Sequence, residues 1–479
     1  MLTTLVSFIV LLIILIFVHE LGHFLAAKIL GVRVETFSLG FPPKMFSKKV
    51  GETVYQLAWI PIGGYVKLLG EEPGEEMDGA DKPRSFSHKP VWAKSIIVLA
   101  GPFFNIVFAV FAIWALSWAS GIQHVGTTLG PMSPDSPIAL AGAMRDDVVT
   151  GIGYVGADGK VPAMNETKYF DELGKAVSES NGRELALRIL RDGRELTLRA
   201  TPVEKEESGI LGDKERGWYL GLTPRTLPVL GRVPSGMPAH EAGILPGDLV
   251  VAMDGVPTPD WQDVIKAIQG RGEDKAVKED GTATPIIITV SRDGSELSIP
   301  VTPDLEPIQD LDGKTSFTPV VGISPRTELL TEPVGPISAF GMGLSDTWRM
   351  AKLTILSVVK LLQNKISPKL MGGPIMIAEI AGKSARHGLA NFILLMAFIS
   401  VNLAILNLLP LPVLDGGQFV IFLLEGIRRK PISLRVREIT QWVGIGAMVA
   451  LMVLVFYNDI SRLVTKFTGP PAQVERKAD

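Results

Sequence analysis

The sequence predicts a polytopic α-helical membrane protein with four transmembrane helices and a long β-rich insert. The mean hydropathy is +0.29 although 20% of the residues are charged, so strongly apolar blocks must alternate with ordinary soluble sequence. Four of these blocks approach or exceed the roughly 20 apolar residues that a helical crossing needs. The region between the second and third blocks repeats itself. A chain of 479 residues has room for two or three domains.

The predicted spans cover residues 1–30, 92–120, 389–411 and 439–460. The first begins without a basic region, and its apolar run continues to Leu30 without an obvious cleavage site. We therefore expect a retained first span, with a cleaved signal peptide as the alternative.

Lysine and arginine are concentrated in two connections, residues 31–91 and 412–438. By the positive-inside rule, both connections are predicted to be cytoplasmic loops. The insert at 121–330, both termini and the tail at 461–479 are then extracytoplasmic. Basic residues before the third span and after the fourth reduce the difference in lysine and arginine content between the two sides of the membrane.

The formal net charge of −3 gives no indication of a nucleic-acid partner. The chain has no cysteine, which excludes disulfides and thiolate metal sites. Any zinc must therefore be held by imidazole and carboxylate groups.

The insert repeats with a period of about one hundred residues. Arg191-Asp192-Gly193 recurs as Arg292-Asp293-Gly294, and the stretch from Ser136 matches the stretch from Gly236 in the same register. Asp-Gly favours the tight turn of a β-hairpin, and alternating apolar residues flank each copy. We expect two small β-rich domains, at 121–220 and 221–330.

The stretch Ala242–Gly255, AGILPGDLVVAMDG, resembles bacterial PDZ domains, and the first copy is a degenerate version of it. The resemblance implies tandem extracytoplasmic PDZ-like domains that recognise peptides or control access. The loops that contain Gly130, Gly231 and Gly236 precede the copies and are the expected peptide-binding loops. Two spacers without a ligand are the alternative.

The first span ends in the motif FVHELGH. His19 and His23 are four residues apart, so both imidazoles lie on one helical face and can bind one metal ion. Glu20 lies where it can act on metal-bound water. A carboxylate near the bilayer centre costs about 2.5–3.5 kcal/mol, so we expect it to have a partner or a function. Polar residues that only pack a helix bundle are the alternative.

A catalytic zinc site usually has three protein ligands and a water molecule. No further histidine follows the motif at a spacing known from soluble zinc proteases. The best remaining candidate is Asp415, within the Leu-Asp-Gly motif at 414–416. Pro410 and Pro412 should end the third helix before it. Asn407 precedes Asp415 by eight residues and either contributes to the site or hydrogen-bonds between helices.

Two further segments have a recognisable pattern. Residues 54–70 are apolar and strand-like, and they form either a membrane-associated β element or an ordinary cytoplasmic hairpin. Residues 331–388 contain apolar positions at helical spacing. We expect an amphipathic helix there, which lies on the membrane surface or packs on the second β-rich domain.

HExxH in the first span, N-x-x-P-x-P-x-L-D-G in the third and two PDZ-like domains between them resemble the site-2 protease family, M50, from about residue 5 to 460. The resemblance implies a zinc ion held by His19, His23 and Asp415, with Glu20 as general base and acid. It further implies substrate positioning by Asn407 and by three residues of the 54–70 element: Gly63, Gly64 and Tyr65. Pro42 replaces a glycine common among relatives and lacks its backbone donor.

The resemblance implies an intramembrane zinc metalloprotease of the bacterial inner membrane that cuts single-span proteins. Anti-sigma factors of an envelope stress response are the expected substrates, together with signal-peptide remnants. We expect a monomer with no nucleic-acid partner. The alternatives are a zinc protease that cuts soluble peptides at the membrane surface and a non-catalytic scaffold that works through its PDZ-like domains.

Overall fold

A computed structural model describes residues 2–71, 79, 81–209, 211–269, 283–326, 329–430 and 432–468. The chain divides into two compact units. The helical unit contains residues 1–121 and 333–461, and the β-rich unit contains residues 122–332 with the chain from 462 onward.

Within the described residues, four helices are long and apolar enough to cross a membrane, as the sequence predicts. They are α1 (Leu2–Ile29), α2 (Val91–Ser120), α10 (Leu389–Asn407) and α12 (Leu434–Thr468). α12 extends beyond the predicted span at both ends because more polar helical turns continue it.

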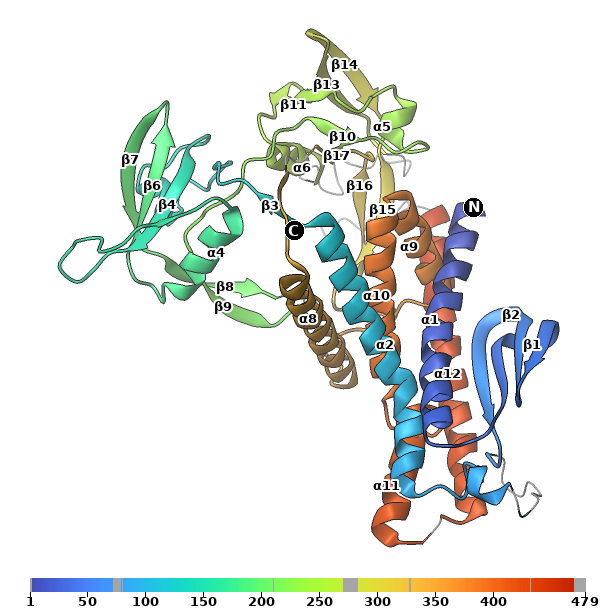
Figure 1. Ribbon diagram of the computed structural model, residues 1–479. Coiled ribbons are helices and arrows are strands. Elements are labelled where there is room, and N and C mark those ends of the chain that lie inside the picture. The colour runs from blue at the N-terminus through green and yellow to red at the C-terminus, as the bar shows by residue number, and fades with distance from the viewer. Residues whose placement is uncertain are drawn as a thin grey trace, which may run out of the picture. The chain divides into compact units, whose positions relative to one another are not determined.

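Glycines bring α1 and α2 into close contact. A Cβ atom at Gly22 of α1 would overlap the backbone of Ala100 and Gly101 in α2. Small residues at such contacts let the backbones of membrane helices approach closely. α10 packs against α2 as well, and these helices run side by side in Figure 1.

The predicted β element at 54–70 is a strand, β2 (Thr53–Leu68), which pairs with β1 (Val34–Val50). Residues 36–39 lie beside both 54–57 and 64–67, so they occupy the middle of the sheet. Residues 64–67 consequently lie at an edge. β2 packs on α1, which brings this edge to the helix that contains the HExxH motif.

Glu52 anchors the turn between β1 and β2. Its carboxylate accepts hydrogen bonds from Lys28 Nζ at 2.7 Å and from Arg84 Nη2 at 2.5 Å. These two hydrogen bonds lower the pKa of Glu52 to about 2. The carboxylate is therefore charged throughout the physiological pH range, and the turn is held at the end of α1.

The helices α8 (Pro336–Leu362) and α9 (Pro374–Arg386) come directly before α10 in the chain. α8 packs along α2 and α10, and Thr354 Oγ1 donates a hydrogen bond of 2.6 Å to Asn402 Oδ1 on α10. Its opposite face exposes apolar side chains such as Leu344 and Trp348. α8 is therefore amphipathic, with its small residues directed toward the helical unit.

Part of the predicted loop at 412–438 is helical. α11 (Asp415–Arg428) begins directly after the proline-rich turn. Cβ atoms at Gly416 and Gly417 would overlap backbone atoms of Leu408 and Leu411, so only glycine permits this sharp turn. Phe422 then packs in an apolar cluster that includes residues of α1 and α2, which the isolated sequence segment does not show.

In the described part of the β-rich unit, two four-stranded sheets have the same topology, β5-β4-β6-β7 and β12-β11-β13-β14. Each sheet has its own apolar core. The first copy consists of α3 (Pro137–Leu140), β4 (Val148–Tyr154), β5 (Asn165–Glu166), α4 (Phe170–Glu179), β6 (Leu185–Arg191) and β7 (Arg194–Ala200). The second consists of α5 (Pro238–Glu241), β11 (Leu249–Met253), β12 (Val256–Pro257), α6 (Trp261–Gln269), β13 (Ile286–Arg292) and β14 (Ser295–Val301).

Short ribbons complete the β-rich unit. A hairpin follows each sheet, β8 (Val203–Ser208) with β9 (Lys214–Tyr219) and β15 (Asp304–Gln309) with β16 (Thr315–Val320). β10 (Leu230–Arg232) pairs with β17 (Ser324–Pro325), and β3 (Ile122–Val125) pairs with β18 (Leu329–Glu332). The described residues also include two short helical turns, η1 (Lys82–Arg84) and η2 (Pro368–Leu370).

Both RDG turns form hairpins, as predicted. Asp192 and Gly193 have positive φ angles of 49° and 76°. The arginine of each turn holds a buried aspartate: Arg191 Nε lies 2.7 Å from Asp147 Oδ1, and Arg292 Nε lies 2.7 Å from Asp248 Oδ1. The repeat thus preserves an ion pair as well as a strand pattern.

The ion pair should stabilise the first β-rich domain measurably. Burial alone would raise the pKa of Asp147, but hydrogen bonds from Arg191 and from the Met144 amide hold it below its usual value. We expect Arg191→Ala to lower the free energy of unfolding by about 2–4 kcal/mol at neutral pH, because it leaves a buried carboxylate unpaired. Since the folded-state pKa is depressed, this contribution is lost as the pH falls below the unfolded value of about 3.9.

Thermal unfolding of the purified protein at pH 7 and at pH 3 measures this difference. Arg194→Ala is the matched control, because Arg194 pairs with Arg191 across the same turn and is exposed. Equal destabilisation by both substitutions would contradict the assignment.

Candidate metal centre

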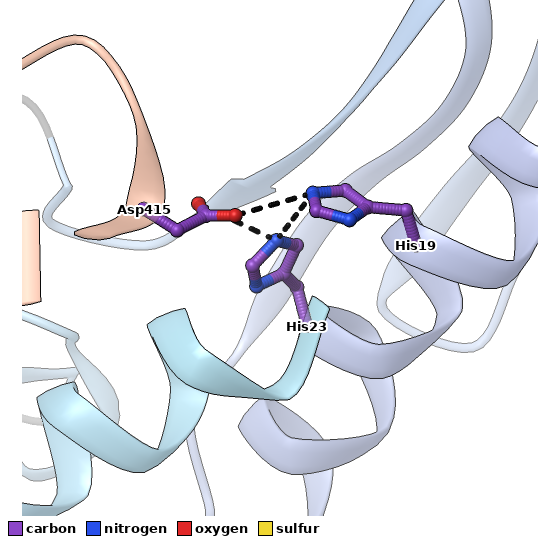
Figure 2. Close-up of side chains that lie close together, drawn as sticks. All are labelled: His19, His23 and Asp415. Carbon is purple, nitrogen blue, oxygen red and sulfur yellow. Dashed lines mark hydrogen bonds and ion pairs between the residues drawn. The ribbon is translucent and has the colours of Figure 1, made fainter. Parts of the chain in front are cut away.

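Three side chains from two distant segments meet inside the helical unit. Nε2 of His19 and Nε2 of His23 lie 3.2 Å apart on successive turns of α1. Asp415, the first residue of α11, places Oδ2 at 3.3 Å from His19 Nε2 and Oδ1 at 3.7 Å from His23 Nε2. Figure 2 shows the two imidazoles and the carboxylate directed toward one another.

These atoms fit a zinc ion. Tetrahedral zinc with bonds of about 2.0–2.1 Å separates its ligand atoms by roughly 3.3 Å. The three candidate ligand atoms all lie within 4.8 Å of one another. Among the described residues, the buried Asp415 Oδ2 makes no hydrogen bond, and its neighbour is His19 Nε2 at 3.3 Å. A buried carboxylate oxygen without a hydrogen bond is costly, and a cation at the centre of the cluster would compensate for it.

The outer nitrogen atoms of the imidazoles also have partners. His23 Nδ1 lies 2.8 Å from the carbonyl oxygen of Ile97, so it carries the proton and leaves Nε2 free to bind a metal. His19 Nδ1 lies 3.1 Å from the side-chain amide of Asn105. Nδ2 of Asn407 lies 3.4 Å from His19 Nε2, which brings this predicted site residue to the centre.

Glycines make room for the cluster. A Cβ atom at Gly101 of α2 would collide with the rings of both histidines. A Cβ atom at Gly64 of β2 would lie 3.0 Å from Glu20 Cγ. The edge of the β1–β2 sheet therefore reaches the side chain of the predicted general base.

Two neighbours of Gly64 contact other parts of the sheet. The hydroxyl of Tyr65 accepts a hydrogen bond of 2.7 Å from Gln56 Nε2, across the central residues of the sheet. Gly63 lies against the ring of Phe41. Tyr65 and Gly63 consequently hold the edge in place, whereas Gly64 is the residue that faces the centre.

The structure places the three candidate loop glycines in the β-rich unit. The amide of Gly130 donates to the carbonyl of Thr223 at 2.8 Å. Gly231 lies in β10 and packs closely on Pro325 of β17. Gly236 has a φ of +77° with no atom close to its Cβ position.

Sequence reasoning missed the contribution of α2. Asn105 contacts His19, the carbonyl of Ile97 contacts His23, and Gly101 lies against both rings, although α2 contributes none of the candidate ligands. The stretch GPFFN at 101–105 contains the signal, but its meaning depends on contacts between helices.

Four apolar helices and a cluster of two imidazoles and a carboxylate between them fit a membrane-embedded, metal-dependent hydrolase. The family model for peptidase family M50 matches residues 7–451, and the chain belongs to this family. Family M50 peptidases are zinc-dependent, and the protein is a zinc metalloprotease of regulated intramembrane proteolysis.

Several curated relatives match along nearly their whole length. The regulator of sigma-E protease RseP of Salmonella typhimurium is 33% identical over 472 residues, which cover 96% of this chain and 98% of the relative. RseP of Escherichia coli is 33% identical over 473 residues, with the same coverage of 96% and 98%. Protease RseP of Yersinia pestis is 32% identical over 473 residues, which cover 96% of this chain and 99% of the relative.

Asp415 provides the test of the ligand set. Losing a group that only orients a ligand typically lowers metal affinity about 10- to 100-fold, and losing a ligand should cost at least as much. We expect Asp415→Ala to lower zinc affinity at least 100-fold, measured as zinc content after dialysis against graded chelator. Glu425→Gln is the control, because Glu425 lies on the same helix and pairs with Arg437 instead. Full zinc retention by Asp415→Ala would exclude it as a ligand.

Proposed function

We propose that this protein hydrolyses peptide bonds within or near the transmembrane segments of single-span membrane proteins, with zinc held by His19, His23 and Asp415. The convergence of these three ligand groups between apolar helices is the observation that carries the proposal. The relatives named as regulators of sigma-E protease favour an anti-sigma factor as a substrate class. Signal-peptide remnants have the same single-span form and are a second class.

Zinc held by His19, His23 and Asp415 would act as a Lewis acid that activates water and polarises the scissile carbonyl. Glu20 follows His19 directly on α1 and takes the proton of the attacking water. It then returns this proton to the leaving amine. Asn407 can direct its amide N–H groups at the substrate, since its Nδ2 lies 3.4 Å from His19 Nε2.

A transmembrane substrate must lose its helical hydrogen bonds before attack, because a helix hides its own amides. We propose that residues 64–67 receive the unwound segment as an added strand. They form an edge of the β1–β2 sheet, and Gly64 lies beside Glu20. Strand pairing would satisfy the backbone of the substrate and hold the scissile bond near the base.

The apolar surface of the β1–β2 sheet supports a position in the bilayer. Met45, Phe46, Trp59 and Ile60 expose between 42% and 65% of their surface. Such a cluster is costly in water and is favourable among lipid acyl chains. It favours the membrane-associated β element over an ordinary cytoplasmic hairpin.

The two domains of the β-rich unit are proposed to be PDZ-like modules that admit shortened substrates. Their common topology and their repeated Arg–Asp pair support a shared module type. The amide of Gly130 donates to the carbonyl of Thr223, just past the expected domain boundary at 220, and Gly231 lies in β10, which pairs with β17. These glycines would therefore shape the neighbouring edge, and Gly236 would form an open loop.

The distribution of basic residues supports the proposed orientation in the bacterial inner membrane. The connections that contain η1 and α11 carry most of the lysine and arginine of the short loops, so they are proposed to be cytoplasmic. The β-rich unit would then be periplasmic, on the side where the ectodomain of a substrate is removed by an earlier cut.

Glu20→Gln separates chemistry from metal binding. We expect this variant to retain zinc but to cleave a model transmembrane substrate in proteoliposomes at least 100-fold more slowly, since glutamine cannot accept the proton. Gel analysis of cleavage, together with the zinc content of the same samples, measures both. Activity near that of the wild type would contradict the role of Glu20 and the proposed mechanism.

Substrate unwinding predicts a dependence on helix stability. Gly–Ser placed beside the cut site of the model substrate should raise the cleavage rate several-fold, and an all-leucine segment of the same length should lower it, because glycine costs about 1 kcal/mol in a helix. A soluble peptide with the same cut site is the control. If it is cleaved equally well in all versions and faster than the membrane-bound form, the enzyme acts on soluble peptides instead.

A further inference from the structure

Asn105 is a fully buried polar residue in the middle of α2. Its side chain has no solvent exposure, and Nδ2 lies 3.1 Å from Nδ1 of His19. Its other polar side-chain atom, Oδ1, is buried and has no hydrogen-bond partner among the residues that the structure describes. An amide oxygen left unpaired in a buried site costs free energy, so the orientation of this amide needs an explanation.

The orientation decides which nitrogen of His19 carries the proton. The oxygen and nitrogen of an asparagine amide are exchanged by a flip that leaves its shape unchanged. With Nδ2 toward His19, the amide donates to Nδ1, and the proton of the neutral imidazole lies on Nε2. That proton would point at Asp415 and His23 and would block metal binding. With Oδ1 toward His19, the oxygen accepts the Nδ1 proton, and Nε2 presents its lone pair to the centre.

The second orientation changes the pairing at both ends of the amide: its oxygen reaches His19, and its N–H groups turn to the position that the unpaired oxygen held. It gives Oδ1 the partner that it lacks, and it gives His19 the same arrangement as His23, whose Nδ1 faces the carbonyl oxygen of Ile97. Both imidazoles would then donate outward to an oxygen on α2 and bind inward through Nε2.

The backbone around Asn105 is also held in place. Ser400 Oγ of α10 donates a hydrogen bond of 2.9 Å to the carbonyl oxygen of Asn105. This contact fixes one turn of α2 against α10 without using the amide of Asn105. The side chain therefore stays at a constant position relative to His19.

We propose that Asn105 is a positioning residue, whose side-chain oxygen accepts the Nδ1 proton of His19 and so fixes the tautomer that binds zinc. This proposal rests on the proposed assignment of His19 as a ligand. It concerns a residue outside the HExxH and LDG motifs, and it assigns a function to the asparagine of the stretch GPFFN.

Three substitutions test the proposal in the full-length protein. Asn105→Leu removes both polar atoms at nearly constant shape, Asn105→Ala removes the side chain, and Asn105→Asp keeps an acceptor but removes the donor. We expect the leucine and alanine variants to bind zinc about 10- to 100-fold more weakly, and the aspartate variant to remain within a few-fold of the wild type. Chelator competition measures the affinity, and the visible spectrum of the cobalt-substituted protein reports the ligand geometry.

Asn402→Leu is the matched control, because Asn402 is another asparagine of a spanning helix and contacts Thr354. Its zinc affinity should equal that of the wild type. The melting temperature of the zinc-free protein separates positioning from packing: a positioning function leaves it nearly unchanged in Asn105→Leu, while zinc raises it less than in the wild type.

The outcomes distinguish this proposal from the proposed function. Wild-type zinc affinity in both Asn105→Leu and Asn105→Ala would overturn the proposal, and so would an aspartate variant that loses zinc as strongly as the leucine variant. If Asn105→Asp does not fold, the leucine and alanine variants still decide the question. Retention of zinc by Asp415→Ala would instead overturn the ligand set.

Discussion

The structure depends on one constraint: polar groups placed between apolar helices must satisfy one another. His19 and His23 have their outer nitrogens beside groups of α2 and their inner nitrogens beside the carboxylate of Asp415. This arrangement ties α1, α2 and the start of α11 together. The close contacts at Gly22 and Gly101 follow from it, because the helices must approach within backbone distance for these side chains to meet.

The same constraint connects the helices with the β1–β2 sheet. An open sheet edge is not stable among lipid chains, because its amide groups lack partners. The edge at residues 64–67 lies beside Glu20, as the proposed strand pairing with an unwound substrate requires. Glu52, in the turn between β1 and β2, holds the sheet through hydrogen bonds from Lys28 and Arg84. Under this proposal, the candidate metal centre and the sheet act together on the substrate.

The domains of the β-rich unit have the features of ordinary water-soluble domains. Each of its domains has an apolar core, a two-residue Asp-Gly turn and a buried aspartate paired with the arginine that precedes this turn. These features recur at one period, so each domain has its own core and its own buried ion pair.

The sequence by itself determined the four apolar helices and the two β-rich repeats and offered the candidate ligand types, because these depend on local composition and spacing. Even Asp415 could be proposed, since few carboxylates lie beside an apolar span. Tertiary structure alone decided the rest. It made residues 415–428 a helix, placed α8 along α2 and α10, and brought Gly64 to Glu20 and Asn105 to His19. The physical reason is that close approach and hydrogen-bond direction arise between segments distant in the chain, where no sequence period records them.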